Sequence, residues 1–225
     1  SAVTDFVEAG LVKNYEAYDE PSGNKNITGV SDMVPVKQEF ELIKRLNPKA
    51  KTVGIIYNPG EANSAHLTVL AKEVAPEMGL KILEAPAVNS SDVASAAQSL
   101  RGRVDAIWIS TDNLVISALP VVAKIAMEDG IALVTADPTT IEQGPVASLG
   151  FNYYTHGRIT GRIVLRILNG ESPKQIPVQL MTDPRDQLLA VNLDTAQSAG
   201  LTIPADVLNQ ADELIYGGHK WTKSK

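Results

Sequence analysis

The sequence predicts an α/β fold, in which parallel strands form sheets flanked by helices. From residue 51 onward, short β-branched runs alternate with longer segments that have the periodicity of helices. Strands separated by helices of about ten residues or more pair in parallel through right-handed crossovers. Aromatic residues are only 5% of the chain against 44% hydrophobic residues, so aliphatic side chains build most of the core, as they do in buried parallel strands.

The first strand–helix unit lies between residues 52 and 79. Thr52–Tyr57 is a β-branched run that ends at the turn sequence Asn58-Pro59-Gly60. Asn63 or Ser64 is expected to cap a helix that continues to a stop at Gly79. Its apolar residues are spaced by three and four, which is the spacing that an amphipathic helix needs to cover a sheet.

The same alternation continues for four more strands. The expected elements are strands at 81–85, 105–110, 131–135 and 146–151 and helices at 93–100, 113–128 and 156–168. Ser90 and Ser91 are candidate caps for the helix at 93–100. A strand at 188–192 follows, and then an acidic helical stretch at 194–214 that is broken at Gly200 and Pro204.

The ends of the chain show weaker patterns. Strand-like pieces occur at 2–4, 26–30 and 177–181, and a short helix and a polar loop at 19–24 separate the first two. The piece at 26–30 has no obvious partner strand nearby in the sequence. The final residues, 218–225, are expected to be a solvated tail.

Composition and missing motifs exclude several classes of function. A formal net charge of −6 argues against nucleic acid as the main partner, because phosphate backbones need a basic face. Cysteine is absent and the three histidines are far apart in sequence, which removes disulfides and thiolate zinc sites and leaves no cofactor or metal expected. The strand–loop–helix segment at 54–64 lacks the Gly-Lys-Ser/Thr ending of a phosphate loop, and no G-x-S-x-G nucleophile elbow occurs.

The candidate site is at the carboxyl ends of the parallel strands, where ligands bind in open α/β sheets. Three polar loops are expected at this edge, at 57–64, 110–113 and 136–140. Asn63 and Ser64 at a helix N-terminus can offer donors to a carboxylate. Asp112 and Asp137 can accept hydrogen bonds from an ammonium group. The edge therefore suits a zwitterion.

The same residues have a simpler interpretation. Asn, Ser, Asp and Pro at strand ends are also good caps and turns, so each loop taken alone favours capping without a ligand. Tyr57 is at a strand end, where ligand contact and core packing both remain open. Trp108 lies inside a strand, where core packing is at least as well supported as ligand stacking.

Several runs of sequence, taken in order, resemble the ABC transporter substrate-binding family with a type I periplasmic-binding fold. The matching runs are Asn26–Asp32, Phe40–Pro48, Val53–Ser64, Ser110–Asn113, Gly130–Val134 and the glycine pattern from Gly144 to Gly170. The resemblance covers the chain from about Ala2 to Leu214. Known members bind tryptophan, phenylalanine or tyrosine, so the resemblance implies an amino-acid ligand, which can be aromatic.

The resemblance also implies where the ligand binds. The loops Glu61–Ser64 and Thr111–Asn113 would line the cleft from one lobe, whereas Thr4-Asp5 and Ser31-Asp32 would be near the hinge or on the opposite lobe. Together with the sequence argument, this gives the expected ligand-binding residues Thr4, Asp5, Ser31, Tyr57, Glu61, Asn63, Ser64, Thr111, Asp112, Asn113 and Asp137.

Members of the family usually carry a further segment before the Thr4-Asp5 motif, which forms most of the first lobe. The resemblance therefore implies an incomplete first lobe, made of residues 1–30 and 152–175. Residues 31–151 and 176–217 would form the second lobe, and 218–225 the tail.

The expected function is that of the solute-binding component of an ABC importer, and not of an enzyme. Such a protein captures a small zwitterionic ligand between its lobes and delivers it to a permease in the membrane. It would be a monomer in the periplasm or outside the cell, with a lipid anchor as one option. The alternatives are the effector-binding core of a transcription regulator, which shares this fold, and an α/β enzyme acting on a small amino or hydroxy acid.

Overall fold

The computed structural model describes residues 3–7, 9–11, 26–181 and 183–223, and the chain divides into two compact units. Unit 1 consists of Ser1–Val34 and Phe151–Gln187, and unit 2 of Pro35–Gly150 and Leu188–Lys225. The chain therefore passes from one unit to the other at three points, after residues 34, 150 and 187.

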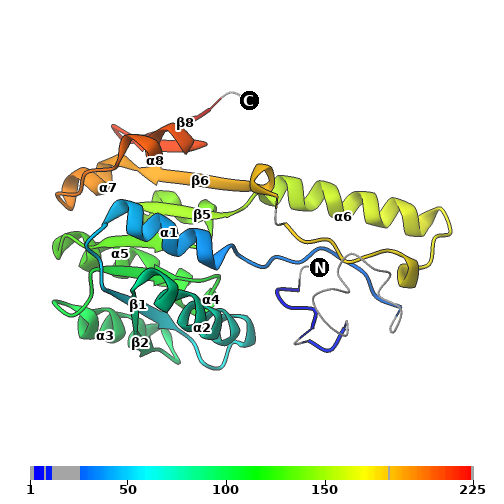
Figure 1. Ribbon diagram of the computed structural model, residues 1–225, viewed down its shortest axis with the longest axis horizontal. Coiled ribbons are helices and arrows are strands. Elements are labelled where there is room, and N and C mark those ends of the chain that lie inside the picture. Colours follow the sequence, from blue (N-terminus) through cyan, green and yellow to red (C-terminus); the bar gives the residue numbers. More distant parts are fainter. Residues whose placement is uncertain (1–2, 8, 12–25, 182, 224–225) are drawn as a thin grey trace. The chain divides into compact units, whose positions relative to one another are not determined.

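The strands form a sheet in the order β2-β1-β3-β4-β5-β6-β7-β8 (Figure 1). Their bounds are Thr52–Tyr57 (β1), Lys81–Pro86 (β2), Ala106–Ile109 (β3), Ala132–Thr135 (β4), Ala147–Phe151 (β5), Gln187–Asn192 (β6), Glu213–Tyr216 (β7) and His219–Thr222 (β8). Pairing is parallel from β2 through β5 and again between β6 and β7, and antiparallel between β7 and β8. The predicted α/β fold with a mostly parallel sheet is confirmed.

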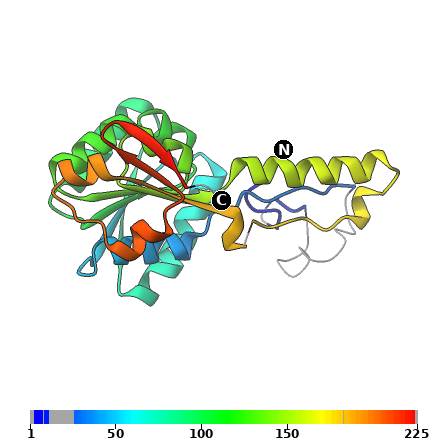
Figure 2. The ribbon, with the colours of Figure 1, turned by 90° about the horizontal axis from the view of Figure 1, so that it is seen from above.

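Helices cover both sides of this sheet, as the view from above shows (Figure 2). The helices of unit 2 are α1 (Val36–Leu46), α2 (Ala62–Val74), α3 (Ser90–Leu100), α4 (Asn113–Ser117), α5 (Leu119–Glu128), α7 (Leu193–Ser198) and α8 (Ala205–Gln210), with short 3₁₀ turns η2 (Ala75–Met78) and η3 (Pro138–Gln143). Helix α1 packs with α2 and α8, whereas α3 packs with α4 and α5.

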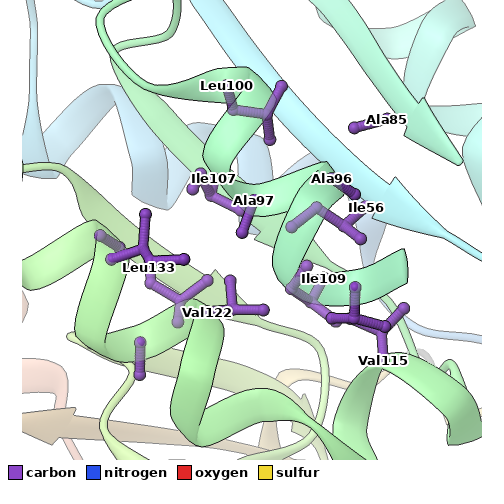
Figure 3. Close-up of a cluster of buried hydrophobic side chains, with 14 of the residues drawn as sticks. Ile56, Ala85, Ala96, Ala97, Leu100, Ile107, Ile109, Val115, Val122 and Leu133 are labelled. Atoms are coloured by element: carbon purple, nitrogen blue, oxygen red, sulfur yellow. The ribbon is translucent and has the colours of Figure 1, made fainter. Parts of the chain in front are cut away.

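The main core lies between β1, β3 and β4 and the helices α3, α4 and α5 (Figure 3). Its members are aliphatic, as the sparse aromatic content predicts. From the middle of the sheet, Ile107 and Ile109 point into this cluster, against Ala97, Val115 and Val122. Burying each such side chain stabilises the fold by about 1.5–3 kcal/mol.

Trp108, between those two isoleucines, lies on the opposite face of the sheet. Trp108 packs edge-on against Phe40 of α1 with ring centroids 5.5 Å apart, and its Nε1 donates a hydrogen bond of 2.6 Å to Glu39 Oε2. All three side chains are buried, so Trp108 belongs to the core. Burial raises the pKa of Glu39 to about 8 although the Trp108 hydrogen bond opposes the rise, and its Oε1 has no partner.

Unit 1 is built around helix α6 (Tyr153–Leu168), with 3₁₀ turns η4 (Pro173–Gln175) and η5 (Pro184–Asp186). Among the described residues of this unit, strand-like pieces meet at two isolated parallel bridges, Val3 with Ser31 and Val30 with Gln179. Phe6 and Val178 are the buried pair of a small apolar cluster beside them. The piece at 26–30 thus finds its partner far away in the sequence.

Several predicted boundaries are wrong. The N-cap of α2 is Glu61 and makes no side-chain capping bond, so Asn63 and Ser64 lie inside the helix. Asn89, not Ser90 or Ser91, caps α3 by accepting from Asp92 N.

The remaining corrections concern longer segments. The helix expected at 113–128 is interrupted at Ala118, one residue before the proline-containing start of α5. The acidic stretch at 194–214 contains two short helices and then enters β7. Strand β8 lies within the expected tail and pairs with β7 through a turn at Gly217 and Gly218, which both have positive φ.

The unit boundaries also differ from the expected lobes. Residues 31–34 and 176–187 belong to unit 1, because Gln179 pairs with Val30 and Val178 packs with Phe6. Residues 218–223 belong with unit 2. The polar loop predicted at 19–24, and Ala2, lie outside the described residues.

Candidate ligand-binding site

The loops after β1, β3 and β4 meet at one edge of unit 2, because these three strands are consecutive neighbours in a parallel sheet. The β1–α2 loop contains Asn58 to Glu61, the β3–α4 loop contains Ser110 to Asp112, and the β4–η3 loop contains Ala136 and Asp137. This arrangement is the one that the sequence predicts.

Asp112 connects the first two loops. It is fully buried, and its Oδ2 accepts hydrogen bonds from Asn58 N at 2.6 Å and Ser64 Oγ at 2.5 Å. Its Oδ1 accepts from Val115 N at 2.9 Å, which caps α4. Bonds to a charged acceptor are worth roughly twice those between neutral groups, so this carboxylate holds the β1–α2 loop firmly against β3.

Two further contacts join the same loops. Asn63 Nδ2 donates to the Thr111 carbonyl oxygen at 2.8 Å. The Glu61 carboxylate accepts from Asn113 N at 3.1 Å and from Asn113 Nδ2 at 2.5 Å. We call the six residues Glu61, Asn63, Ser64, Thr111, Asp112 and Asn113 the rim network. Ser64 bonds to Asp112 and Asn113 to Glu61 through their side chains, whereas Asn63 bonds to the backbone of Thr111. These bonds hold the two loops together.

The rim network leaves the first turn of α2 without a side-chain cap. Helix α2 begins after Glu61, and at its start Ala65 N donates a hydrogen bond of 2.9 Å to Glu61 O. The N–H groups of the first helical residues have no intrahelical acceptor in any α-helix. The Asn63 and Ser64 side chains point to Thr111 and Asp112, so no side chain of the helix caps these donors.

Tyr57 and Asp137 are not joined to the rim network by these bonds. Tyr57 Oη donates to Glu84 Oε2 of β2 at 2.8 Å, and Lys72 Nζ donates to Glu84 Oε1 at 2.7 Å. Partial burial and then the hydrogen bond to the Glu84 carboxylate raise the pKa of Tyr57, whereas the Lys72 hydrogen bond lowers that of Glu84. Asp137 Oδ1 accepts from Thr139 N at 2.9 Å and caps η3.

The expected residues of unit 1 also form a local cluster. Ser31 is buried, donates from Oγ to the Thr4 carbonyl oxygen at 2.7 Å and accepts from Met33 N at 3.1 Å. Asp5 is 7% exposed, and its Oδ1 accepts from Val7 N at 2.8 Å. Thr4 and Ser31 are therefore side by side, at the bridge between Val3 and Ser31.

Sequence reasoning missed three polar residues of these sites. Asn58 supplies the backbone N–H that Asp112 binds, and its place in the turn sequence after β1 was the available signal. Ser110 Oγ is 3.4 Å from Ser64 Oγ. Glu84 of β2 binds Tyr57 of β1. No local sequence pattern predicts this contact, because it depends on the pairing of β1 with β2, which neither strand's sequence specifies.

Within the described part of the chain, no three His, Cys, Asp or Glu side chains are grouped so that they could hold a metal ion. The helices of that same part include none with the length and apolar character needed to cross a membrane.

The fold and the loop edge define a class of protein: the type I periplasmic-binding-like folds, whose ligands bind at the carboxyl ends of parallel strands. The chain belongs to the family of ABC transporter substrate binding proteins, whose family model matches residues 1–215.

Among curated proteins, the chain is similar to the tyrosine-binding protein of Clostridioides difficile strain R20291. The two are 35% identical over 198 residues, which are 88% of this chain and 55% of that protein. An uncharacterised protein of Rickettsia prowazekii is 25% identical over 167 residues, which are 74% of this chain and 52% of that protein. The chain thus spans about half the length of the curated relatives that it matches.

The chain is also similar to several solved structures. A conserved domain protein from Vibrio cholerae has a TM-score of 0.84 and 40% identity, with 95% of this chain and 70% of that chain covered. An ABC domain from Streptococcus pneumoniae in complex with L-Trp has a TM-score of 0.82 and 32% identity, with 95% and 72% covered. A ribose operon repressor from Lactobacillus acidophilus, at 18% identity and a TM-score of 0.53, shares the fold alone.

Proposed function

We propose that this chain is part of the solute-binding component of an ABC importer that captures an aromatic amino acid and delivers it to a membrane permease. The observation that carries the proposal is the rim network, which fixes two loops at the carboxyl ends of β1 and β3 and leaves the N-terminus of α2 uncapped by any side chain of the helix. Two relatives support the choice of ligand: one is named for tyrosine, and another is solved with L-Trp.

The first turn of α2 supplies what a ligand carboxylate needs. Free backbone N–H groups and the positive end of the helix dipole bind anions without any basic side chain. Glu61 is next to this turn, and its carboxylate accepts hydrogen bonds from Asn113 N and Nδ2. The ligand carboxylate therefore binds to backbone groups, and the predicted side-chain donors Asn63 and Ser64 position them.

Delivery to a permease places the protein outside the cytoplasmic membrane, in the periplasm or extracellular space, and a lipid anchor is compatible with that site of action. A monomer suffices for this role. In a binding protein of this kind, the ligand stabilises one conformation by contacts that are made only there, and the permease reads that conformation.

The test is a calorimetric and thermal-shift screen of the full-length protein with the twenty amino acids, sugars and nucleosides. We expect L-tyrosine, L-tryptophan or L-phenylalanine to bind without being turned over. Binding of a sugar or nucleoside alone would instead support the effector core of a regulator, and turnover of a bound acid would support an enzyme.

A backbone substitution tests the α2 turn directly. Ala62 is the first residue of α2, and proline is well tolerated at this position although it has no N–H. Glu61 before it has φ −101° and ψ 109°, which is compatible with a following proline. Removing one charge-assisted bond of about 1.5–3 kcal/mol predicts that Ala62→Pro weakens amino-acid binding by roughly 10- to 100-fold.

The matched control is Ala205→Pro at the first residue of α8, whose preceding residue is also extended. Both variants are expected to unfold at nearly the wild-type temperature. Unchanged affinity in Ala62→Pro would show that the N-terminus of α2 does not bind the ligand carboxylate.

A further inference from the structure

Helix α6 of unit 1 carries three arginines and no acidic residue. Arg158, Arg162 and Arg166 follow one another at intervals of four, so they lie along one side of the helix. The chain as a whole has 26 acidic residues against 20 lysines and arginines. The positive charge of this helix is therefore not a consequence of the overall composition.

Arg166 is paired with a carboxylate, whereas the other two arginines are not. Arg166 forms an ion pair with Glu171. In the part of the chain that the structure describes, no carboxylate pairs with Arg158 or Arg162, although the Arg158 guanidinium lies 5.9 Å from the centroid of the Tyr154 ring. Like charges four residues apart on a helix repel each other. An anion bound between these two arginines would remove the repulsion.

The two unpaired arginines line a cavity of about 350 Å³, and all of its lining belongs to unit 1. The other lining residues are Thr155, Ile159, Asp183, Arg185 and Asp186. Six of the seven lining residues are polar or charged, so the cavity suits a polar ligand and not an apolar one.

The charges of the lining leave a positive excess on the side of α6. Asp183 and Arg185 of η5 are bonded to each other, with Asp183 Oδ2 2.5 Å from Arg185 Nη2 and Asp183 Oδ1 2.9 Å from Arg185 N. The Arg185 side-chain hydrogen bond lowers the pKa of Asp183 to about 2, so these two opposite charges cancel at neutral pH. Asp186 then contributes one negative charge against the two positive charges of Arg158 and Arg162.

We propose that this cavity binds a phosphate group through Arg158 and Arg162. A guanidinium group is planar, and its N–H donors match phosphate oxygens in pairs. A phosphate has enough oxygens to accept from two arginines one helical turn apart, and the Thr155 hydroxyl, three residues before Arg158 in the same lining, can donate to it as well.

The phosphate can be a free ion or part of the headgroup of an anionic phospholipid, because both present the same oxygens. General attraction does not bring this protein to an anionic surface, since its formal net charge is −6. Binding to such a surface therefore needs a local cationic site. The site lies outside the rim network and goes beyond the proposed function.

The test uses the full-length protein, with Arg158→Gln and Arg162→Gln as the variants. The first probe is inorganic phosphate, measured by calorimetry. The second is cosedimentation with vesicles of phosphatidylglycerol and phosphatidylcholine, compared with vesicles of phosphatidylcholine alone. L-Tyrosine is the third probe. The matched control is Arg166→Gln, which removes the same charge from the same helix outside the lining of the cavity.

We expect Arg158→Gln and Arg162→Gln each to weaken phosphate binding about 10-fold, which corresponds to about 1.4 kcal/mol. Arg166→Gln should bind as the wild type. All three side chains are exposed, so the variants should unfold at nearly the wild-type temperature. If a glutamine variant does not fold, the lysine variant at the same position, which keeps the charge but loses the planar fork, should show a loss as well.

The two sources of phosphate are separated by the probes. Binding of inorganic phosphate supports a site for the free ion, whereas binding of phosphatidylglycerol vesicles without binding of inorganic phosphate supports a site for a lipid headgroup. A wild type that binds neither probe would overturn the proposal, and so would an equal loss in all three variants, which would show an effect of net charge alone. Loss of L-tyrosine binding in Arg158→Gln and Arg162→Gln would overturn it too, because the arginines would then serve the amino acid.

Discussion

The buried Glu39 makes the stability of unit 2 depend on pH, and Glu39→Gln isolates this effect. Its pKa rises from 4.5 in the unfolded chain to about 8 in the folded protein, chiefly because burial disfavours the charged form. Between these values the folded state keeps a proton that the unfolded state has released. Raising the pH therefore favours unfolding, and the stability present at pH 4.5 and below is lost progressively up to about pH 8.

The size of the effect follows from the shift. Each pKa unit corresponds to about 1.4 kcal/mol, so a full shift would remove up to roughly 5 kcal/mol between pH 4.5 and 8, and relaxation of the site reduces this to a few kcal/mol. Glutamine has nearly the same shape, can accept the Trp108 hydrogen bond through its oxygen and does not titrate. Glu39→Gln should equal the wild type within about 1 kcal/mol at pH 5 and exceed it by about 2–4 kcal/mol at pH 9.

The assay is urea unfolding of the full-length protein between pH 5 and 9, followed by tryptophan fluorescence and circular dichroism. The exposed Glu41 on the same helix provides the control variant Glu41→Gln, which should follow the wild type at every pH. A stability difference between Glu39→Gln and wild type that does not grow with pH would refute the reasoning, since it would show that Glu39 is ionised in the folded state or not buried.

Three other substitutions test the packing and the rim network. In Gly150→Ala, the added Cβ would overlap the Ala136 carbonyl oxygen and approach Pro138 Cδ to 2.8 Å, so we expect a loss of about 3 kcal/mol in the free energy of unfolding. A Cβ on Gly157 of α6 meets nothing within 4 Å, and Gly157→Ala should stabilise the helix by up to about 1 kcal/mol. Thermal unfolding measures both variants, and a Gly150→Ala protein more stable than Gly157→Ala would contradict this reasoning. Asp112→Asn turns an acceptor of three hydrogen bonds into a partial donor, and should cost about 2 kcal/mol or more and weaken amino-acid binding. Wild-type stability and affinity of this variant would contradict the role of Asp112 in holding the loops.

The sequence predicts the sheet of unit 2 well, because its strands are short β-branched runs separated by helices. The same alternation places the loops after β1, β3 and β4 at one edge. It cannot say how the polar groups there divide between ligand and protein: Asp112 looks like an ammonium acceptor until its partners Asn58 and Ser64 are seen in space.

The errors have a common physical origin in contacts between distant residues. Val30 pairs with Gln179 across most of the chain, and this pairing moves residues 176–187 into unit 1. Tyr57 meets Glu84 only because β1 and β2 are neighbours. Caps are missed for a smaller reason: Asn89 and its neighbours Ser90 and Ser91 are all good capping residues, and local propensity does not choose among them.

In the rim network, side chains fix the loops and backbone groups remain for a ligand, and this has a consequence for the evolution of such a protein. Its hydrogen-bonded side chains hold the two loops in place, and under the proposed function the ligand carboxylate would bind peptide N–H groups, which every residue except proline has. A substitution elsewhere in the protein could change which ligand side chain is accepted, while these N–H groups would continue to bind the ligand carboxylate. The side chains that hold the loops, in contrast, could not be replaced singly without loss of several contacts, because Asp112 accepts hydrogen bonds from three donors.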